Sequence, residues 1–335
     1  MVGDNRRETV MGILRSSFVI FAFLTSFISQ AAAAGPIRDL LMEHKTTQKS
    51  IESPEDSESS DGVGSLPQGV KVLRDIPYGQ DGKHRMDVYI SRDARKGAPV
   101  IFMVHGGAWR IGDKASRAVV ENKVSRWVAR GFIFVSVNYR LLPNADPLQQ
   151  AEDVARALAT AQAQAVSWGG NSSKFILMGH SAGAHLVALL GAAPSKAIGV
   201  GVRPWLGAIL LDSAALDVVQ IMEAKHARFY NGAFGNQPAY WRSASPFHVL
   251  TASASPLLAV CSTRRKDSCS EARNFTAQAT SLGAHAKVLE QNLSHREINE
   301  NLGLPGAYTQ AVEEFMGSLD AAVMETLTTP STGTH

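Results

Sequence analysis

The sequence Gly-His-Ser-Ala-Gly at residues 179–183 decides how the rest of the chain is interpreted. An apolar run at residues 175–178 precedes it and an alanine- and leucine-rich run at residues 184–190 follows, so the pattern predicts a strand, a tight turn and a helix. Glycines two positions before and after Ser181 allow a sharp turn that exposes the serine hydroxyl above a sheet. These flanking elements favour a nucleophile elbow over the alternative, a plain glycine-rich turn.

Upstream of the elbow, apolar strands alternate with helical segments. Residues 99–104 and 132–137 are continuous apolar runs, typical of strands that are covered on both faces. Residues 115–130 and 147–168 have helical patterns. Strands that alternate with helices predict the α/β class, with a mostly parallel central sheet flanked by helices.

Further elements are expected on both sides of this region. Residues 70–73 and 86–90 are short alternating runs that predict an antiparallel hairpin at a sheet edge. After the elbow, buried strands are expected at residues 206–211 and 256–260, a further strand at residues 286–290, and a helix at about residues 269–282.

The strand expected at residues 99–104 ends in His-Gly-Gly-Ala-Trp at residues 105–109. Consecutive glycines let backbone N–H groups converge on one point, as stabilisation of an oxyanion requires. We expect the N–H groups of Gly107 and Ala108, with that of Ala182 beside the elbow serine, to form an oxyanion hole. A turn after a buried strand is the alternative for the His-Gly-Gly sequence alone.

These motifs, with Asn-Tyr-Arg-Leu at residues 138–141 between them, resemble the α/β-hydrolase superfamily. The similarity is to the hormone-sensitive-lipase-like carboxylesterases and to the related arylformamidase and feruloyl-esterase-like proteins, and it covers about residues 70–325. It implies an α/β-hydrolase fold with a small lid insertion. Ala108 departs from the lipase-like pattern, which usually has a third glycine there, but alanine still supplies its backbone N–H.

The resemblance also implies an acid and a histidine after the serine in chain order. In the family the acid usually follows the penultimate expected strand, which indicates Asp267; the rival is Asp212, at the end of the strand before it. Both aspartates have an alternative interpretation as caps. His295 lies in the loop after the last expected strand, where the fold puts its general base. The implied catalytic triad is Ser181, Asp267 and His295.

Residues 213–250 separate two expected strands and are long for a simple loop. They are rich in aromatic residues, and in the family such an insertion forms a lid over the pocket. We expect Trp109, Tyr230 and Trp241 to line that pocket, which would suit an apolar or aromatic acyl or alcohol group. An aromatic-rich packed loop is the alternative.

The two cysteines of the chain, Cys261 and Cys269, lie on either side of a charged turn that includes Arg265. A strand end and a helix start can bring two α-carbons within bridging range, about 4.4–6.8 Å. Because disulfides persist outside a reducing cytosol, we expect a disulfide in an exported protein. Two free thiols are the alternative.

The N-terminus has the order of a secretory signal peptide. Residues 1–34 contain arginines, then an apolar run, then small residues that predict cleavage after about Ala34 and export to the periplasm or the medium. An uncleaved membrane anchor is the alternative; after cleavage we expect no stable membrane span. Residues 35–69 are expected to be a flexible extension, residues 70–325 the catalytic domain and residues 326–335 a flexible tail.

Composition excludes other partners. The net charge is +3 and no stretch combines basic with aromatic residues, so nucleic acid is not an expected partner. The ten histidines lack ligand-like spacing, and we expect neither a metal nor a cofactor. The expected function is hydrolysis of small or medium carboxylic esters by a serine hydrolase. The alternatives are an arylformamidase-like amide hydrolase and a non-catalytic binding protein on the same fold.

Overall fold

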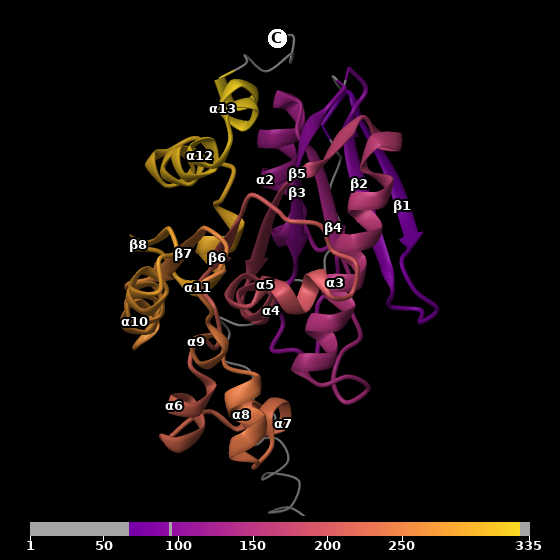
Figure 1. Ribbon diagram of the computed structural model, residues 1–335. Helices are drawn as coiled ribbons and strands as arrows, with labels where there is room; N and C mark the ends of the chain where they lie inside the picture. The colour runs from indigo at the N-terminus through magenta and orange to yellow at the C-terminus, as the bar shows by residue number, and fades with distance from the viewer. Residues whose placement is uncertain (1–66, 94–95, 329–335) are drawn as a thin grey trace, which may run out of the picture. The chain divides into compact units, whose positions relative to one another are not determined.

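The computed structural model describes residues 67–93 and 96–328, which form an eight-stranded sheet with helices on both faces (Figure 1). The strand order is β1-β2-β4-β3-β5-β6-β7-β8. The pairs β1·β2 and β2·β4 are antiparallel and all the others are parallel, which confirms the predicted α/β class and the edge hairpin. In chain order the strands are β1 (Val70–Pro77), β2 (Arg85–Ser91), β3 (Ala98–Val104), β4 (Ile133–Val137), β5 (Gly170–His180), β6 (Gly207–Leu211), β7 (Leu257–Ser262) and β8 (Ala286–Gln291).

Helices cover the sheet on both sides and make up the segments between strands. They are α2 (Arg117–Trp127), α3 (Pro147–Gln164), α4 (Ala182–Ala192), α5 (Pro194–Ile198), α6 (Val218–Glu223), α7 (Arg228–Phe234), α8 (Pro238–Ser243), α9 (Pro246–Val249), α10 (Ser268–Ser281), α11 (His295–Glu300), α12 (Ala307–Leu319) and α13 (Ala321–Thr328). Short 3-10 turns, Val128–Arg130 and Ala165–Trp168, finish the helical segments that begin with α2 and α3.

The core has two layers because the strands are apolar on both faces. Along β3, Val100, Phe102 and Val104 pack into one layer with residues of α3, α4 and α10. Ile101 and Met103 pack into the other layer with residues of α2, α12 and α13. Since successive side chains of a strand point to opposite faces, a continuous apolar run is what a sheet covered twice requires.

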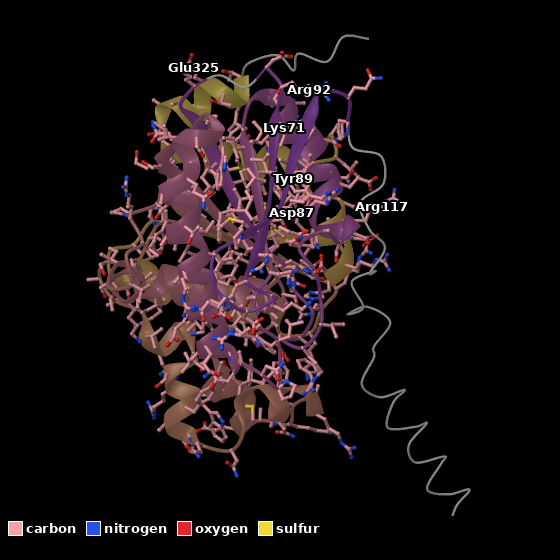
Figure 2. All side chains as sticks on the ribbon, turned by 90° about the vertical axis from the view of Figure 1, so that its right-hand side faces the viewer. Lys71, Asp87, Tyr89, Arg92, Arg117 and Glu325 are labelled. Carbon is pink, nitrogen blue, oxygen red and sulfur yellow. A yellow bond between two sulfur atoms is a disulfide. The ribbon has the colours of Figure 1, made fainter. Side chains whose placement is uncertain are left out.

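A buried ion pair fastens the segment after β3 to the edge of the sheet. Figure 2 looks onto this edge and labels Lys71 on β1 and Asp87 and Tyr89 on β2. Asp87 is fully buried, and Nζ of Lys114 lies 2.8 Å from its carboxylate. The N–H of Lys114 also donates to the side-chain oxygen of Asn138, just after β4 (2.6 Å). Both contacts are made by Lys114, so they hold the C-terminal part of the loop that carries the predicted oxyanion residues.

The predicted insertion at residues 213–250 contains the four short helices α6 to α9. Figure 1 shows α6, α7 and α8 as one group below the sheet in that view. Asp217 caps α6 by accepting a hydrogen bond from the N–H of Gln220 (3.1 Å). The N–H of Phe247 donates to the carbonyl oxygen of Leu216 (2.9 Å), so the two ends of the group are joined.

The predicted signal peptide, almost all of the predicted extension, and residues 329–335 lie outside the described residues. The predicted boundary of the tail at residue 326 is too early, because α13 continues to Thr328. Within the described part of the chain, no helix is long and apolar enough to cross a membrane.

Candidate active site

Ser181 occupies the sharp turn between β5 and α4, as the elbow pattern predicts. Its backbone has φ 52° and ψ −118°, an uncommon conformation for a residue with a side chain. The N–H of Ser181 donates to the carbonyl oxygen of Leu211 at the end of β6 (3.0 Å). A Cβ atom on Gly183 would lie 2.3 Å from the carbonyl oxygen of Val104, and one on Gly179 would lie 2.4 Å from that of Gly183. Gly183 therefore lets the elbow approach β3 closely, and Gly179 lets the turn itself close tightly.

Asp212 and His295 form a buried pair beside this elbow. Oδ2 of Asp212, the residue after β6, lies 2.6 Å from Nδ1 of His295, the first residue of α11. The ring of His180, which directly precedes Ser181, lies 4.5 Å from the His295 ring, centroid to centroid. Nε2 of His180 donates to the carbonyl oxygen of His295 (3.0 Å). The ends of β5, β6 and β8 thus bring the serine, the aspartate and the histidine to one edge of the sheet.

The prediction of Asp267 as the acid is wrong, and the rival Asp212 takes that position. The side chain of Asp267 is 66% exposed, and its nearest ion-pair partner is Lys266 at 4.0 Å. Asp267 occupies the N-cap position of α10 at φ 66°, although its side chain makes no capping hydrogen bond. By contrast, the N–H of Asp212 donates to the carbonyl oxygen of Val260 on β7 (2.8 Å). This hydrogen bond holds Asp212 against β7.

Asp212 is surrounded by donors that keep it ionised. Its Oδ1 accepts hydrogen bonds from the N–H of Ser262 (3.0 Å) and from the hydroxyl of Ser268. Its Oδ2 accepts from Arg265 as well as from His295. Burial alone would raise the pKa of Asp212, but the hydrogen bond from His295 and the charge of Arg265 hold this pKa below its usual range.

The same surroundings disfavour the charged form of His295. Burial and the neighbouring His180 lower the pKa of His295, and they outweigh the hydrogen bond to Asp212 that acts in the opposite direction. A neutral imidazole that is oriented by a carboxylate is the form that can accept a proton.

The predicted oxyanion residues lie in a tight turn after β3. Gly107, Ala108 and Trp109 have φ values of 106°, 48° and 60°. His105 braces this turn, because its Nδ1 donates to the Gly106 carbonyl (2.7 Å) and its ring stacks on Tyr139 at 4.6 Å.

On the elbow side, Ala182 is the first residue of α4. The first N–H groups of a helix have no partner within the helix, so they can stabilise an anion. The N–H of Ala182 is one of these first groups, as its predicted oxyanion role requires.

The aromatic residues predicted for the pocket separate into two environments. Trp109 is fully buried and packs against α7, with ring centroids 6.0 Å from Tyr230 and 4.9 Å from Phe234. The hydroxyl of Tyr230 donates to the Ala214 carbonyl (2.7 Å). Trp241 lies on α8 and donates from Nε1 to the Phe234 carbonyl (3.1 Å). Trp109 and Tyr230 thus come together, while Trp241 contacts the C-terminal end of α7.

The predicted disulfide is confirmed: Cys261 and Cys269 are bonded, with α-carbons 5.1 Å apart. The bridge joins the end of β7 to the start of α10 and closes the loop that supplies Ser262, Arg265 and Ser268 to Asp212. These three contacts were not predicted, because a charged turn in a sequence does not indicate which buried group it approaches. Their only signal was the position of the turn between two cysteines.

No group of three or more His, Cys, Asp or Glu residues in the described part of the chain has a geometry that could hold a metal ion.

The sheet order, with the elbow after β5 and the aspartate and histidine at neighbouring strand ends, defines an α/β-hydrolase. A family model described as BD-FAE matches residues 86–267, more than half of the 335 residues, and the chain belongs to this family.

Named relatives match parts of the chain. The probable isoprenylcysteine alpha-carbonyl methylesterase ICME of Oryza sativa subsp. japonica is 36% identical over 118 residues, which are 35% of this chain and 28% of that protein. Esterase LipQ of Mycobacterium tuberculosis (strain ATCC 25618 / H37Rv) is 39% identical over 118 residues, 34% of this chain and 28% of LipQ. Esterase LipC of the same strain is 29% identical over 205 residues, 57% of this chain and 50% of LipC. The matches span between about a quarter and a half of these relatives.

Among solved structures, esterase B from Lactobacillus Rhamnosis (HN001) has the same fold, with a TM-score of 0.64 and 16% sequence identity. The alignment covers 86% of this chain and 96% of that one. An esterase from the Planctomycetes species Thermogutta terrifontis aligns with a TM-score of 0.61 and 18% identity, over 76% of this chain and 95% of that one.

Proposed function

We propose that this protein is a serine carboxylesterase that cleaves small or medium esters through an acyl-enzyme intermediate. The observation that carries the proposal is the buried contact of 2.6 Å between Asp212 and His295 beside a serine at a strained elbow. Membership of the BD-FAE family and the similarity to proteins named as esterases support an ester rather than an amide as substrate.

In this mechanism Ser181 attacks the ester carbonyl, because a serine hydroxyl becomes nucleophilic when a base removes its proton. Nδ1 of His295 donates to Asp212, so Nε2 is the nitrogen that accepts the serine proton. The carboxylate of Asp212 stabilises the imidazolium that forms. His295 then returns the proton to the leaving alcohol.

Backbone N–H groups of Gly107, Ala108 and Ala182 would stabilise the tetrahedral oxyanion. Loss of one such donor typically costs about a hundredfold or more in rate. Water that is activated by His295 then releases the acyl group and restores Ser181.

We also propose that the protein is exported and loses residues 1–34. The order of charged, apolar and small residues supports this, and a disulfide suits an oxidising compartment. Mass spectrometry of the exported protein should find a chain that begins near Gly35, and retention of Met1 would replace the proposal with a membrane anchor.

The test of the activity uses a panel of p-nitrophenyl esters of different acyl length, with N-formyl aromatic amines as the amide comparison. We expect turnover of the esters and labelling by a fluorophosphonate in the wild-type protein, with both lost in Ser181→Ala. A folded wild-type protein that the fluorophosphonate does not label, or that Ser181→Ala leaves equally reactive, would contradict the proposal and favour a non-catalytic role.

A further inference from the structure

The guanidinium of Arg265 reaches the same carboxylate oxygen that His295 uses. Nη1 of Arg265 lies 2.8 Å from Oδ2 of Asp212 and 3.1 Å from Nδ1 of His295. Asp212 is fully buried and His295 almost so. A permanent positive charge therefore stands within hydrogen-bond distance of both partners of the proposed acid–base pair.

The distances decide whether Nδ1 of His295 carries a proton. An arginine nitrogen only donates, so its approach to Nδ1 is a hydrogen bond only if Nδ1 carries no proton. In that case Nδ1 and Oδ2 of Asp212 would be two acceptors 2.6 Å apart, which is repulsive. The shorter contact therefore assigns the proton to Nδ1, pointing at Asp212. Arg265 and His295 are then two donors that share one oxygen.

The loop that carries Arg265 is held at both ends. The N–H of Arg265 donates to Oγ of Ser262 (3.2 Å), and Ser262 and Ser268 both hydrogen-bond Oδ1 of Asp212. The disulfide closes the loop outside these two serines. Arg265 is thus fixed relative to the carboxylate, rather than free to swing into solvent as a surface arginine does.

Other charged and titratable groups face His295 from the neighbouring elements. His180 contacts it from β5, and Asp212 from the end of β6. Tyr308 on α12 is partly buried, and its hydroxyl donates to the carbonyl oxygen of Ile298 on α11 (2.8 Å). Burial and the charge of Asp212 raise the pKa of Tyr308 well above its ordinary value, so it stays neutral. Among these groups Asp212 favours a charged imidazolium at His295, whereas the neighbouring His180 and the cation of Arg265 oppose it.

Arg265 has a second acidic neighbour, Glu271 on α10. Burial raises the pKa of Glu271 to about 7, against the charge of Arg265. Below neutral pH this carboxyl is largely protonated, so Asp212 is then the anion that balances Arg265.

We propose that Arg265 is a positioning residue of the site: it fixes the carboxylate of Asp212 for His295 and keeps His295 neutral, and therefore able to act as a base, at lower pH than Asp212 alone would allow. This inference rests on the proposed esterase function. The resemblance to the family predicts the acid in the loop after β7. In this chain that loop supplies instead a cation, Arg265, which orients Asp212 at the end of the neighbouring strand β6.

The test is the pH profile of kcat/KM for p-nitrophenyl acetate. Product release is followed at the wavelength where p-nitrophenol and p-nitrophenolate absorb equally. Its acid limb reports the protonation of the base in the free enzyme. Arg265→Gln removes the charge and should move this limb to higher pH by about one unit. Arg265→Lys keeps the charge and should return the limb to near its wild-type position. Arg264→Gln, which removes an exposed neighbouring arginine that pairs with Glu297, is the control and should leave the limb unchanged.

The comparison of Arg265 with Arg265→Gln is repeated in a Glu271→Gln background, which removes the titration of the Glu271 carboxyl. The shift of the acid limb to higher pH should persist there. An acid limb that stays in place or moves to lower pH in Arg265→Gln, in a protein whose thermal unfolding shows it to be folded, would overturn the inference.

A second readout does not depend on turnover. NMR titration of the His295 ring in Ser181→Ala should show the same upward shift when Arg265→Gln is added. If the wild-type protein lacked esterase activity but this shift appeared, the proposed function would fail while the electrostatic role of Arg265 stood. A titration of His295 that Arg265→Gln leaves unchanged would overturn that role whatever the activity.

Discussion

Nε1 of Trp109 donates a hydrogen bond to Nδ1 of His185 over 3.1 Å, and so joins the oxyanion turn to the helix that follows Ser181. The other ring nitrogen of His185 donates to the carbonyl oxygen of Ala244, after α8 (2.7 Å). One histidine therefore connects the turn, α4 and the insertion. Because Nδ1 must accept and Nε2 must donate, the ring is neutral and has a single tautomer.

We predict that His185 makes the stability depend on pH. Burial lowers the pKa of His185 to about 4, against about 6.5 in the unfolded chain. Since only the unfolded state binds the proton between these values, the free energy of unfolding should fall by about 2 kcal/mol from pH 7 to pH 5. Urea unfolding of His185→Gln, which keeps an acceptor and a donor, should show a weaker dependence in this range.

The matched control is His285→Gln, at an exposed histidine, which should keep the wild-type pH dependence. An equal slope for wild type and His185→Gln would show that His185 is not the titrating group.

Gly183→Ala should destabilise the protein strongly. The added Cβ would lie 2.3 Å from the carbonyl oxygen of Val104 and 2.4 Å from that of His105, and backbone atoms cannot move aside easily. We expect a loss of about 3 kcal/mol in the free energy of unfolding. Gly82→Ala, where the added Cβ meets nothing within 4 Å, should change it little. Equal unfolding midpoints for the two variants would contradict the close approach of the elbow to β3.

Opening the disulfide should lower activity before the domain unfolds. The bridge closes a short loop, and its removal should cost about 2.5 kcal/mol in the chain-entropy model. The loop carries Ser262 and Ser268, which hydrogen-bond Asp212. Under reducing conditions kcat/KM should therefore fall while the far-UV circular dichroism spectrum stays unchanged. Cys261→Ser/Cys269→Ser should behave like the reduced protein and should not respond to reductant. A reduced protein with full kcat/KM would show that the bridge does not position Asp212.

Much of the fold was predictable because its signals are local. The continuous apolar runs, the glycines around Ser181 and the position of His295 after the last strand each reflect a requirement of a single element. The two cysteines were also predictable, since the ends of one strand and one helix placed them within reach. Helix ends were less exact: the predicted segment from residue 115 starts as α2 only at Arg117 and finishes in a 3-10 turn.

The identity of the acid was not predictable in the same way. Asp212 and Asp267 both follow buried strands, and both have left-handed backbone conformations that the sequence does not distinguish. The choice depends on the path of the loop after β7, which presents Ser262, Arg265 and Ser268 to Asp212 and leaves Asp267 in solvent. Such contacts between segments some fifty residues apart leave no periodic pattern in the sequence.

The most direct test of the account compares Asp212→Asn with Asp267→Asn in the hydrolysis of p-nitrophenyl acetate. An asparagine at position 212 cannot hold the proton on Nδ1 of His295, so kcat/KM should fall on the order of a thousandfold or more while fluorophosphonate labelling of Ser181 slows in parallel. Asp267→Asn should stay within about twofold of wild type, because its side chain is 66% exposed and its ion-pair partner is Lys266. Loss of turnover in Asp267→Asn with activity retained in Asp212→Asn would contradict the assignment of the acid and the site built on it.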